Sequence, residues 1–379
     1  MGFSKFEHVK ISAIAGVVPE KVINIDDEIE FYNNDPKLLE RNKKILGLGT
    51  RHVADDGVSN TDMCEAAILK LINDNNIDKN NIDAIVVSST SLDYKYPATS
   101  CILHGRLDLS ETCSCFDITG ISCSSYVYSL WNIFSLIESK AIKNCILVNG
   151  DIASRHTNVE NRNIAILLGD AAVATYLEFD EENNFSYFLT GSRGKDWKKL
   201  IAPAGGSLLP IKEDIVNLKI TNDRGDVWHL WEDIMQGFEV FKYTAEIGPW
   251  GIKNLLNYSG KTIDDIEFFV NHQANKQIVN TIMKHAGVPK EKYSTDTFRK
   301  YANCGGVSIA TNVCDVLKDE KVKDVLFSSF GTGLSYAFAI INLSKFKNSG
   351  ISVYIPTEPP LTRQEQIDYW IKYYKGEVQ

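Results

Sequence analysis

The chain repeats one strand–helix–strand pattern, and this repetition limits the folds that its 379 residues can adopt. Each copy has a short apolar strand after an acidic turn, a helix that opens on small residues, and a second apolar strand at nearly the same spacing. The copies comprise residues 83–88, 123–137 and 142–150 in the first half, and 265–271, 304–318 and 322–331 in the second. Strands alternating with helices predict a largely parallel sheet, so the pattern indicates a duplicated α/β unit.

The duplication sets the predicted domain boundaries and has one consequence for function. We assign residues 1–178 to a first half, 179–344 to a second half and 345–379 to a C-terminal extension. Cys123 and Asn303 then stand at corresponding helix starts. We therefore expect the two halves to converge on one site at these two residues.

Periodicity and capping signals predict the other elements. We expect strands at 8–18, around Phe116 and at 168–179, and helices at 26–46 with a break at Asp35–Pro36, at 61–72 with Thr61 as its cap, from Thr99, at 231–245, and after Pro249 as far as Tyr258. Residues 180–228 are polar and rich in glycine and aspartate, which predicts an irregular excursion that lines a site.

The C-terminal extension is predicted to end in a helix over 362–375. Thr362 and Glu365 match a capping box, and apolar residues at 367, 370, 371 and 374 share one face. We expect that face to dock on the core of the chain or on a partner subunit.

Composition argues against several classes of protein. A net charge of −9 argues against a nucleic-acid partner, which would require excess Lys and Arg on one face. No apolar run is long enough to span a membrane, and the N-terminal segment lacks the apolar core of a signal peptide. The eight cysteines are scattered rather than grouped at ligand spacing, so we expect reduced thiols, a cytoplasmic protein and no bound metal.

Cys123 is the strongest candidate for a nucleophile. It follows a tight turn, Gly120 to Ser122, and opens an apolar-periodic helix. The unpaired N–H groups and the dipole at a helix start favour the thiolate, and the same N–H groups can bind an oxyanion. The alternative is that Cys123 is an ordinary core residue, since free cysteine is among the most buried residue types.

Two further residues complete a possible catalytic set. His272 ends a buried strand, where open α/β sheets place their ligands, although a histidine at a strand end is often structural. Asn303 starts a helix and is, taken alone, equally well explained as a cap. Cysteine, histidine and asparagine together supply a nucleophile, an acid or base and an amide donor, as thioester chemistry requires.

With these residues in place, the chain resembles the β-ketoacyl-acyl carrier protein synthase III branch of the thiolase-fold condensing enzymes. The resemblance covers about residues 8–344 and rests on motifs in a fixed order: TSLDYKYPAT (90–99), the Cys-Ser-x-aromatic core within 116–130, LGD (168–170), PAGG (203–206), MQGFEVF (235–241), NHQAN (271–275), NCGGVSI (303–309) and FGTG (330–333). It implies a five-layer α/β/α/β/α architecture made of two duplicated halves, and a role in fatty acid biosynthesis.

The resemblance also assigns roles to individual residues. Cys123 matches the acylated nucleophile, and His272 and Asn303 match the pair that stabilises the enolate formed when a malonyl thioester loses carbon dioxide. The backbone amides of Cys123 and Thr332 match the oxyanion hole. The predicted substrate pocket comprises Tyr96, which matches an aromatic residue contributed across a dimer interface, together with Ser125, Gly305 and Gly306.

Several positions depart from the family pattern. The interval from Asp117 to Cys123 is one residue longer, which makes Ser122 a second candidate nucleophile, and Ser125 replaces a glycine. The coenzyme A clamp is absent, because residues 26–46 contain no Trp and Gly49 stands where an Arg belongs. Arg51 matches a neighbouring basic position. In the family a basic residue that contacts carrier protein follows the histidine. In this chain that basic position is displaced, with Lys276 and then Gln277 after the motif.

Three hypotheses for function follow. The first is a homodimeric enzyme that acylates Cys123 and condenses the acyl group with a malonyl thioester; its partners are acyl carrier protein, acyl-coenzyme A or both, and it needs no other cofactor. The second keeps the acyl-enzyme but transfers the acyl group to an alcohol or amine without decarboxylation. The third is a partner subunit that kept the fold and lost turnover.

Overall fold

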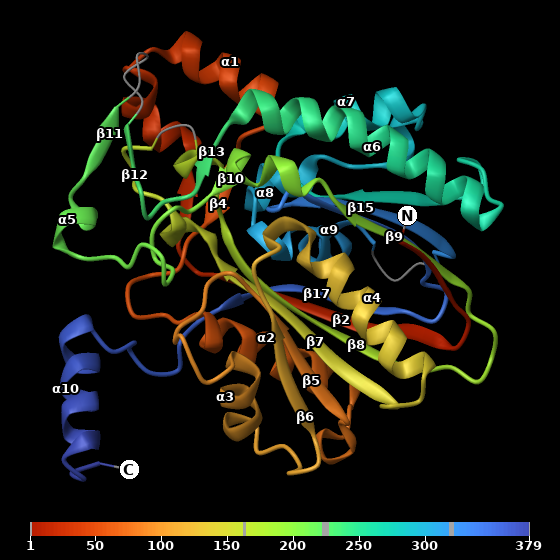
Figure 1. The fold of residues 1–379 in the computed structure, drawn as a ribbon, viewed down its shortest axis with the longest axis horizontal. Helices are drawn as coiled ribbons and strands as arrows, with labels where there is room; N and C mark the ends of the chain where they lie inside the picture. Colours follow the sequence, from red (N-terminus) through yellow and green to blue (C-terminus); the bar gives the residue numbers. More distant parts are fainter. Residues whose placement is uncertain (1, 162–163, 222–226, 318–321, 379) are drawn as a thin grey trace.

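Two β-sheets with a layer of helices between them organise the chain (Figure 1). The structure is a computed structural model and describes residues 2–161, 164–221, 227–317 and 322–378. Within these residues the first sheet has six strands, in the order β17-β2-β8-β7-β5-β6, and the second has five, in the order β1-β9-β16-β15-β14.

The strands of the first sheet are β17 (Lys347–Tyr354), β2 (Val9–Pro19), β8 (Asp170–Phe179), β7 (Asn144–Ile152), β5 (Ala84–Ser88) and β6 (Ser114–Ile118). Those of the second are β1 (Gly2–Phe6), β9 (Ser186–Ser192), β16 (Ser335–Asn342), β15 (Asp324–Gly331) and β14 (Phe268–Asn271). Three small ribbons pair β3 (Val22–Asn24) with β4 (Thr50–His52), β10 (Leu200–Ile201) with β13 (Ile234–Met235), and β11 (Lys219–Thr221) with β12 (Val227–His229).

The helices are α1 (Pro36–Leu46), α2 (Asn60–Asn75), α3 (Thr99–Arg106), α4 (Ser125–Glu138), α5 (Glu213–Val216), α6 (Gly237–Ser259), α7 (Lys276–Ala286), α8 (Asp296–Tyr301), α9 (Ser308–Val316) and α10 (Arg363–Tyr374). Short 3₁₀ turns precede α1 (η1, Ile25–Tyr32), α4 (η3, Ser122–Ser124) and α9 (η8, Gly305–Val307). None of the helices in the described ranges has both the length and the apolar character needed to cross a bilayer.

The two sheets repeat one topology, as the duplicated sequence pattern predicts. In the first, β8 lies antiparallel between β2 and β7, and β7 is parallel to β5. In the second, β16 lies antiparallel between β9 and β15, and β15 is parallel to β14. The strand series β2-β8-β7-β5 therefore corresponds to β9-β16-β15-β14.

Alternating side chains on the strands build five layers. Along β7, Cys145 and Leu147 face the central core, whereas Ile146 and Val148 face the outer core against α2 and α3. The central core also contains the apolar faces of α4 and α9, and α6 and α7 cover the outer face of the second sheet. The predicted α/β/α/β/α architecture is confirmed, and it brings the starts of α4 and α9 together between the sheets.

Each sheet receives an edge strand from the opposite end of the chain. The N-terminal strand β1 pairs with β9 in the second sheet, and β17, from the predicted extension, pairs with β2 in the first. The boundaries at 178 and 344 stay predictions. The second sheet is completed by β1 from the first half, and the first sheet by β17 from the C-terminal extension.

Several predicted elements differ from the structure. Residues 186–192, assigned to the irregular excursion, form β9, whose apolar Phe188 and Leu189 were obscured by polar flanks. Helix α6 begins at Gly237 rather than 231 and continues through Pro249, because packing on α7 and the sheet outweighs the lost N–H bond. Ser59 caps α2 in place of Thr61. The predicted end of α9 at Lys318 lies outside the described residues.

Helix α10 forms as predicted, with Thr362 and Glu365 in a capping box. Its apolar face does not dock on the core, since none of its residues is buried. One aromatic contact ties it to the body of the chain, between the rings of Tyr94 and Trp370, whose centroids are 5.8 Å apart. Docking on a partner subunit stays a prediction.

The packing of α6 on the second sheet gives a test of this architecture. A Cβ atom at Gly251 would lie 2.1 Å from the ring of Phe338, whereas one at Gly237 in the same helix would meet nothing within 4 Å. We expect Gly251→Ala to lower the free energy of unfolding by roughly 1–3 kcal/mol, because the buried ring must move. Urea denaturation measures this, with Gly237→Ala as the matched control; equal stability of the two variants would contradict the packing.

Candidate active site

Cys123 lies in the 3₁₀ turn η3 that leads into α4, where the sequence places it. The second half holds this turn in position. A Cβ atom at Gly331 would lie 2.2 Å from the carbonyl oxygen of Ile121, so only glycine allows the end of β15 to approach so closely. Thr332 Oγ1 donates a hydrogen bond to the carbonyl of Gly120 at 2.8 Å. The backbone around the thiol is therefore fixed by residues about two hundred positions away.

The Cys123 thiol is protonated at neutral pH, which differs from the thiolate expected at a helix start. Burial raises the pKa of Cys123 to about 12, and the carboxylates of Asp151 and Asp233 add to the increase. Hydrogen bonds from Ser122 and the backbone lower the pKa by less. Removal from water, the largest effect on this group, therefore outweighs the hydrogen bonds at the helix start.

Asn303 is positioned by the first half. Its backbone N–H donates to Leu167 O at 2.8 Å, and its carbonyl accepts from Gly169 N at 3.1 Å. Its side-chain Oδ1 accepts the Gly305 N–H at 3.1 Å, which fixes the turn that leads into η8. The N-cap of η8 is Cys304 and makes no side-chain cap bond, so the alternative that Asn303 is the helix cap is wrong by one position. The turn contact uses only the oxygen of the Asn303 amide, and within the described part of the chain Nδ2 donates to no other group. Asn303 thus keeps an amide donor at the cavity.

His272 directly follows β14 and is buried, with 6% of its surface exposed. Its backbone N–H donates to Ser328 O at 2.9 Å, and its Nδ1 is buried without a hydrogen-bond partner in the described chain. Burial lowers the pKa of His272 to about 4, so the imidazole is neutral at physiological pH. A neutral ring with an unpaired nitrogen is suited to hydrogen bonding and is a weak base.

A cavity of about 580 Å³ lies between the two halves. Cys123, Asn303 and Thr332 line it together, while His272 is not among its lining residues. The remaining wall is largely apolar and includes Ile164, Leu167, Leu168, Trp197, Leu200, Ile201, Trp231 and Met235. The excursion supplies Trp197 and Leu200, so the prediction that it lines a site is confirmed.

The other predicted pocket residues take different places. Gly305 and the second candidate nucleophile, Ser122, line the cavity. Ser125 and Gly306 do not line the cavity. They pack against each other behind its wall: Ser125 is buried, and a Cβ atom at Gly306 would lie 2.5 Å from Ser125 Oγ. Tyr96 is 78% exposed and does not line the cavity of its own chain. Its role in a partner's cavity stays a prediction.

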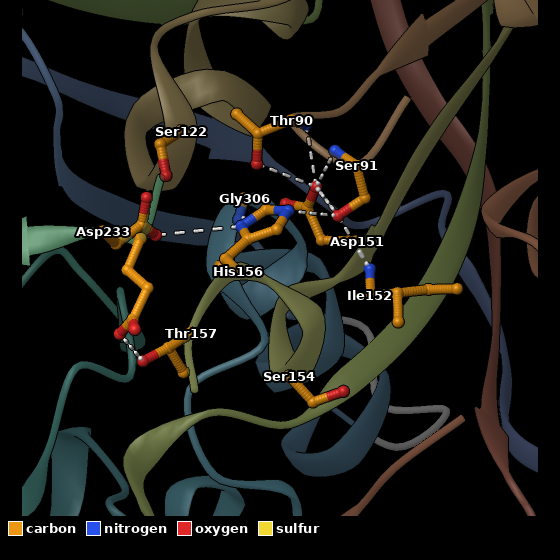
Figure 2. A network of polar contacts seen from close by, with 12 residues as sticks. Thr90, Ser91, Ser122, Asp151, Ile152, Ser154, His156, Thr157, Asp233 and Gly306 are labelled. Carbon is orange, nitrogen blue, oxygen red and sulfur yellow. Dashed lines mark hydrogen bonds and ion pairs between the residues drawn. The ribbon is translucent and has the colours of Figure 1, made fainter. Parts of the chain in front are cut away.

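Three polar residues near Cys123 were not identified from the sequence. Asp151, at the end of β7, is buried and accepts hydrogen bonds from the backbone N–H groups of Thr90 and, at 2.8 Å, Gly306 (Figure 2). His156 and Asp233 line the cavity and pair with each other. The position of Asp151 at a strand end was a usable signal, but nothing in the sequence indicated that 156 and 233 meet.

The region that corresponds to the missing coenzyme A clamp, around residues 49 and 51, is closed. Both terminal nitrogens of the Arg51 guanidinium, Nη1 and Nη2, donate to the carboxylate of Glu28, and the two side chains are 11% and 10% exposed. A Cβ atom at Gly49 would lie 2.3 Å from the carbonyl oxygen of Arg299, so no arginine fits there. The described chain therefore offers neither position 49 nor a free Arg51 side chain to a nucleotide.

Comparisons with known proteins agree on one family. Residues 116–194 match 3-Oxoacyl-[acyl-carrier-protein (ACP)] synthase III, and residues 256–343 match its C-terminal part. The chain is 35% identical to a Campylobacter jejuni protein provisionally named 3-oxoacyl-[acyl-carrier-protein] synthase 3, over 93% of this chain and 98% of that one. It is 28% identical to the Fusobacterium nucleatum beta-ketoacyl-[acyl-carrier-protein] synthase III, over 88% and 98%.

Solved structures give the same result. The 3-oxoacyl-(acyl-carrier protein) synthase from Burkholderia xenovorans superposes with a TM-score of 0.85 at 27% identity. The superposition covers 93% of this chain and 99% of that structure. The likeness therefore extends over both halves and includes the site between them.

The raised pKa of the Cys123 thiol gives a test. We expect iodoacetamide to alkylate Cys123 slowly at pH 7.5, with a rate that rises about tenfold per pH unit up to at least pH 10, because only the thiolate reacts and its pKa is about 12. Mass spectrometry of the peptide that contains Cys123 measures the rate, with the exposed Cys101 as reference. A rate that levels off below pH 8 would show that the turn stabilises the thiolate after all.

Proposed function

Because the chain belongs to the 3-oxoacyl-[acyl-carrier-protein] synthase III family, we propose that it forms an acyl-enzyme at Cys123 and condenses the acyl group with a malonyl thioester. One observation carries this proposal: Cys123, Asn303 and Thr332 line a single cavity although they come from both halves of the chain. This arrangement supplies a nucleophile, an amide donor and backbone N–H groups to one bound thioester.

In the first step the Cys123 sulfur attacks the acyl thioester carbonyl. A new carbon–sulfur bond forms, the bond to the carrier thiol breaks, and the carrier thiolate takes the proton from Cys123. The raised pKa of the Cys123 thiol fits this order, because the thiol stays protonated until the substrate arrives. The backbone N–H groups of Cys123 and Thr332 are the proposed donors to the oxyanion.

In the second step the malonyl group loses carbon dioxide. The electron pair of the broken carbon–carbon bond forms an enolate, and its carbon attacks the acyl-enzyme and expels Cys123. Asn303 Nδ2 and the neutral imidazole of His272 are the proposed hydrogen-bond donors to the enolate oxygen. A neutral imidazole donor requires the tautomer whose N–H faces the substrate.

We propose that the acyl donor is carried on the phosphopantetheine of an acyl carrier protein rather than on coenzyme A. The pairing of Arg51 with Glu28 and the closed surface at Gly49 support this choice, since neither leaves a cation for a nucleotide phosphate. A homodimer is proposed with it, in which the exposed Tyr96 reaches the cavity of a second copy.

One observation favours a second candidate function. His272 does not line the cavity, and a decarboxylating enzyme needs its enolate donors at the substrate. If the imidazole stays outside, the acyl-enzyme passes its acyl group to an alcohol or amine. A carbon–oxygen or carbon–nitrogen bond forms, the carbon–sulfur bond to Cys123 breaks, and the Cys123 thiolate takes the proton that the acceptor loses. Such an enzyme would release no carbon dioxide.

The acyl-enzyme gives the first test. Incubation with an acyl carrier-protein thioester, followed by mass spectrometry, is expected to show one acyl group on the wild type and on Ser122→Ala, and none on Cys123→Ala. The two variants remove neighbouring heteroatoms that both line the cavity, so each is the control for the other. Acylation that persists in Cys123→Ala would overturn the assignment.

Carbon dioxide release separates the two candidate functions. With carboxyl-labelled malonyl carrier protein we expect the acylated wild type to release label, and Asn303→Ala to release it roughly 10²–10³ times more slowly, because one enolate donor is lost. Acylation of Cys123 by the same variant is the control. An acylated wild type that releases no label, yet transfers its acyl group to an alcohol or amine, would select the second function.

A further inference from the structure

Two polar side chains, His156 and Asp233, lie side by side in a cavity wall that is largely apolar and also includes Thr90, Ser122 and Arg155. The Arg155 guanidinium is bound by the carbonyl groups of Val58 and Asp55. Neither His156 nor Asp233 belongs to the set that the proposed reaction uses. Their side chains are 23% and 39% exposed, so both remain accessible from the cavity. An accessible polar pair among apolar side chains is the arrangement that fixes the orientation of a ligand.

The pair is built rather than incidental. The backbone N–H of Asp233 donates to the carbonyl of His156 at 3.1 Å, which places the two residues side by side. His156 Nε2 lies 2.9 Å from Ser91 Oγ, and Ser91 Oγ also accepts the Ile152 N–H at 3.0 Å. The imidazole is therefore held from behind, with Nδ1 directed to Asp233 (Figure 2).

A buried carboxylate anchors the segment that carries Asp233. Glu232 is fully buried, and its side chain accepts hydrogen bonds from Thr157 Oγ1 at 3.0 Å and Asn161 Nδ2 at 2.9 Å. It also pairs with the His229 ring. Because Glu232 points into the protein, its neighbours Trp231 and Asp233 line the cavity.

The geometry of the pair leaves room for a ligand atom. His156 Nδ1 and Asp233 Oδ2 are 3.7 Å apart, which is too far for a good hydrogen bond. Burial alone would lower the pKa of His156, but the carboxylates of Asp233, Asp151 and Asp170 outweigh it and raise the pKa above its usual range. The pair thus presents an N–H donor beside a carboxylate acceptor.

We propose that this pair binds a hydroxyl group on the acyl chain, so that the enzyme takes a short hydroxyacyl thioester rather than a plain fatty acyl one. A hydroxyl accepts from His156 Nδ1–H and donates to Asp233 at the same time. A methyl group would leave both polar groups without a partner, which costs binding free energy. This inference rests on the proposed function and specifies its substrate.

The test compares hydroxylated and plain acyl groups of equal length. The probes are 3-hydroxybutyryl-, 4-hydroxybutyryl- and butyryl-pantetheine thioesters, and the measured quantity is the second-order rate of Cys123 acylation. In the wild type we expect one hydroxyacyl probe to react at least about ten times faster than butyryl, since a site built for a hydroxyl discriminates against its absence. In Asp233→Asn and His156→Gln the ratio is expected to fall toward one.

Glu160→Gln is the matched control. It makes the same carboxylate-to-amide change on an exposed side chain that pairs with Lys219 and does not line the cavity, so the ratio is expected to stay at the wild-type value. Thermal unfolding of each variant shows whether it is folded. Two independent substitutions are used so that the test still holds if one variant does not fold. Equal rates for all three probes in the wild type, or an unchanged ratio in both cavity variants, would overturn the proposal.

Failure of the proposed function has a different signature. If no thioester acylates Cys123, the pair is tested by binding instead, through calorimetry with the unreactive amide analogues of the three probes. Tighter binding of a hydroxyacyl amide that is lost in Asp233→Asn supports the hydroxyl site, and equal affinities for the three amides overturn it.

Discussion

The site depends on one buried carboxylate that joins the two halves of the chain. Asp151 Oδ1 accepts from the N–H groups of Thr90 and Ser91 in the first half, while Oδ2 accepts the Gly306 N–H at the start of the second-half helix α9. A buried charge is tolerated only when several donors surround it, so the two helix starts are held where these donors converge. Gly306 suits this contact because a Cβ atom there would lie 3.1 Å from Asp151 Oδ2 and closer still to Ser125 Oγ.

The same carboxylate shapes the electrostatics of the cavity. It adds to the effect of burial in raising the pKa of the Cys123 thiol, whereas burial alone lowers the pKa of His272. Both groups are therefore neutral at physiological pH, and Cys123 and His272 do not form a thiolate–imidazolium pair. In the proposed reaction charge develops only when a thioester is bound, next to backbone N–H groups that are already in position. The negative charges of Asp151 and Asp233 also disfavour a free thiolate, which limits side reactions of the nucleophile.

The sequence was sufficient where local pattern and duplication determine structure. The repeated strand–helix–strand units and the helical turns that begin near Cys123 and just after Asn303 depend on short spacings, and the structure shows each of them. Strand β9 and the continuous helix α6 were missed because packing on distant elements decided them, against polar flanks in one case and Pro249 in the other. The thiol pKa was wrong for a related reason: burial is a tertiary property, and the sequence shows only the helix start.

The pairing of His156 with Asp233 lay beyond sequence reasoning, and its place in the duplicated fold explains why. In each half, an inserted segment connects the first inner strand to the outer helix: residues 20–59 between β2 and α2, and residues 193–236 between β9 and α6. Neither segment belongs to the repeated strand–helix–strand units, so the repeat did not predict what it contacts, and the second segment supplies Trp197, Trp231 and Asp233 to the cavity. The repeated core supplies Cys123 and Asn303. In the proposed reaction the repeated core therefore holds the reacting groups, whereas the second segment forms part of the wall against which the acyl group would pack.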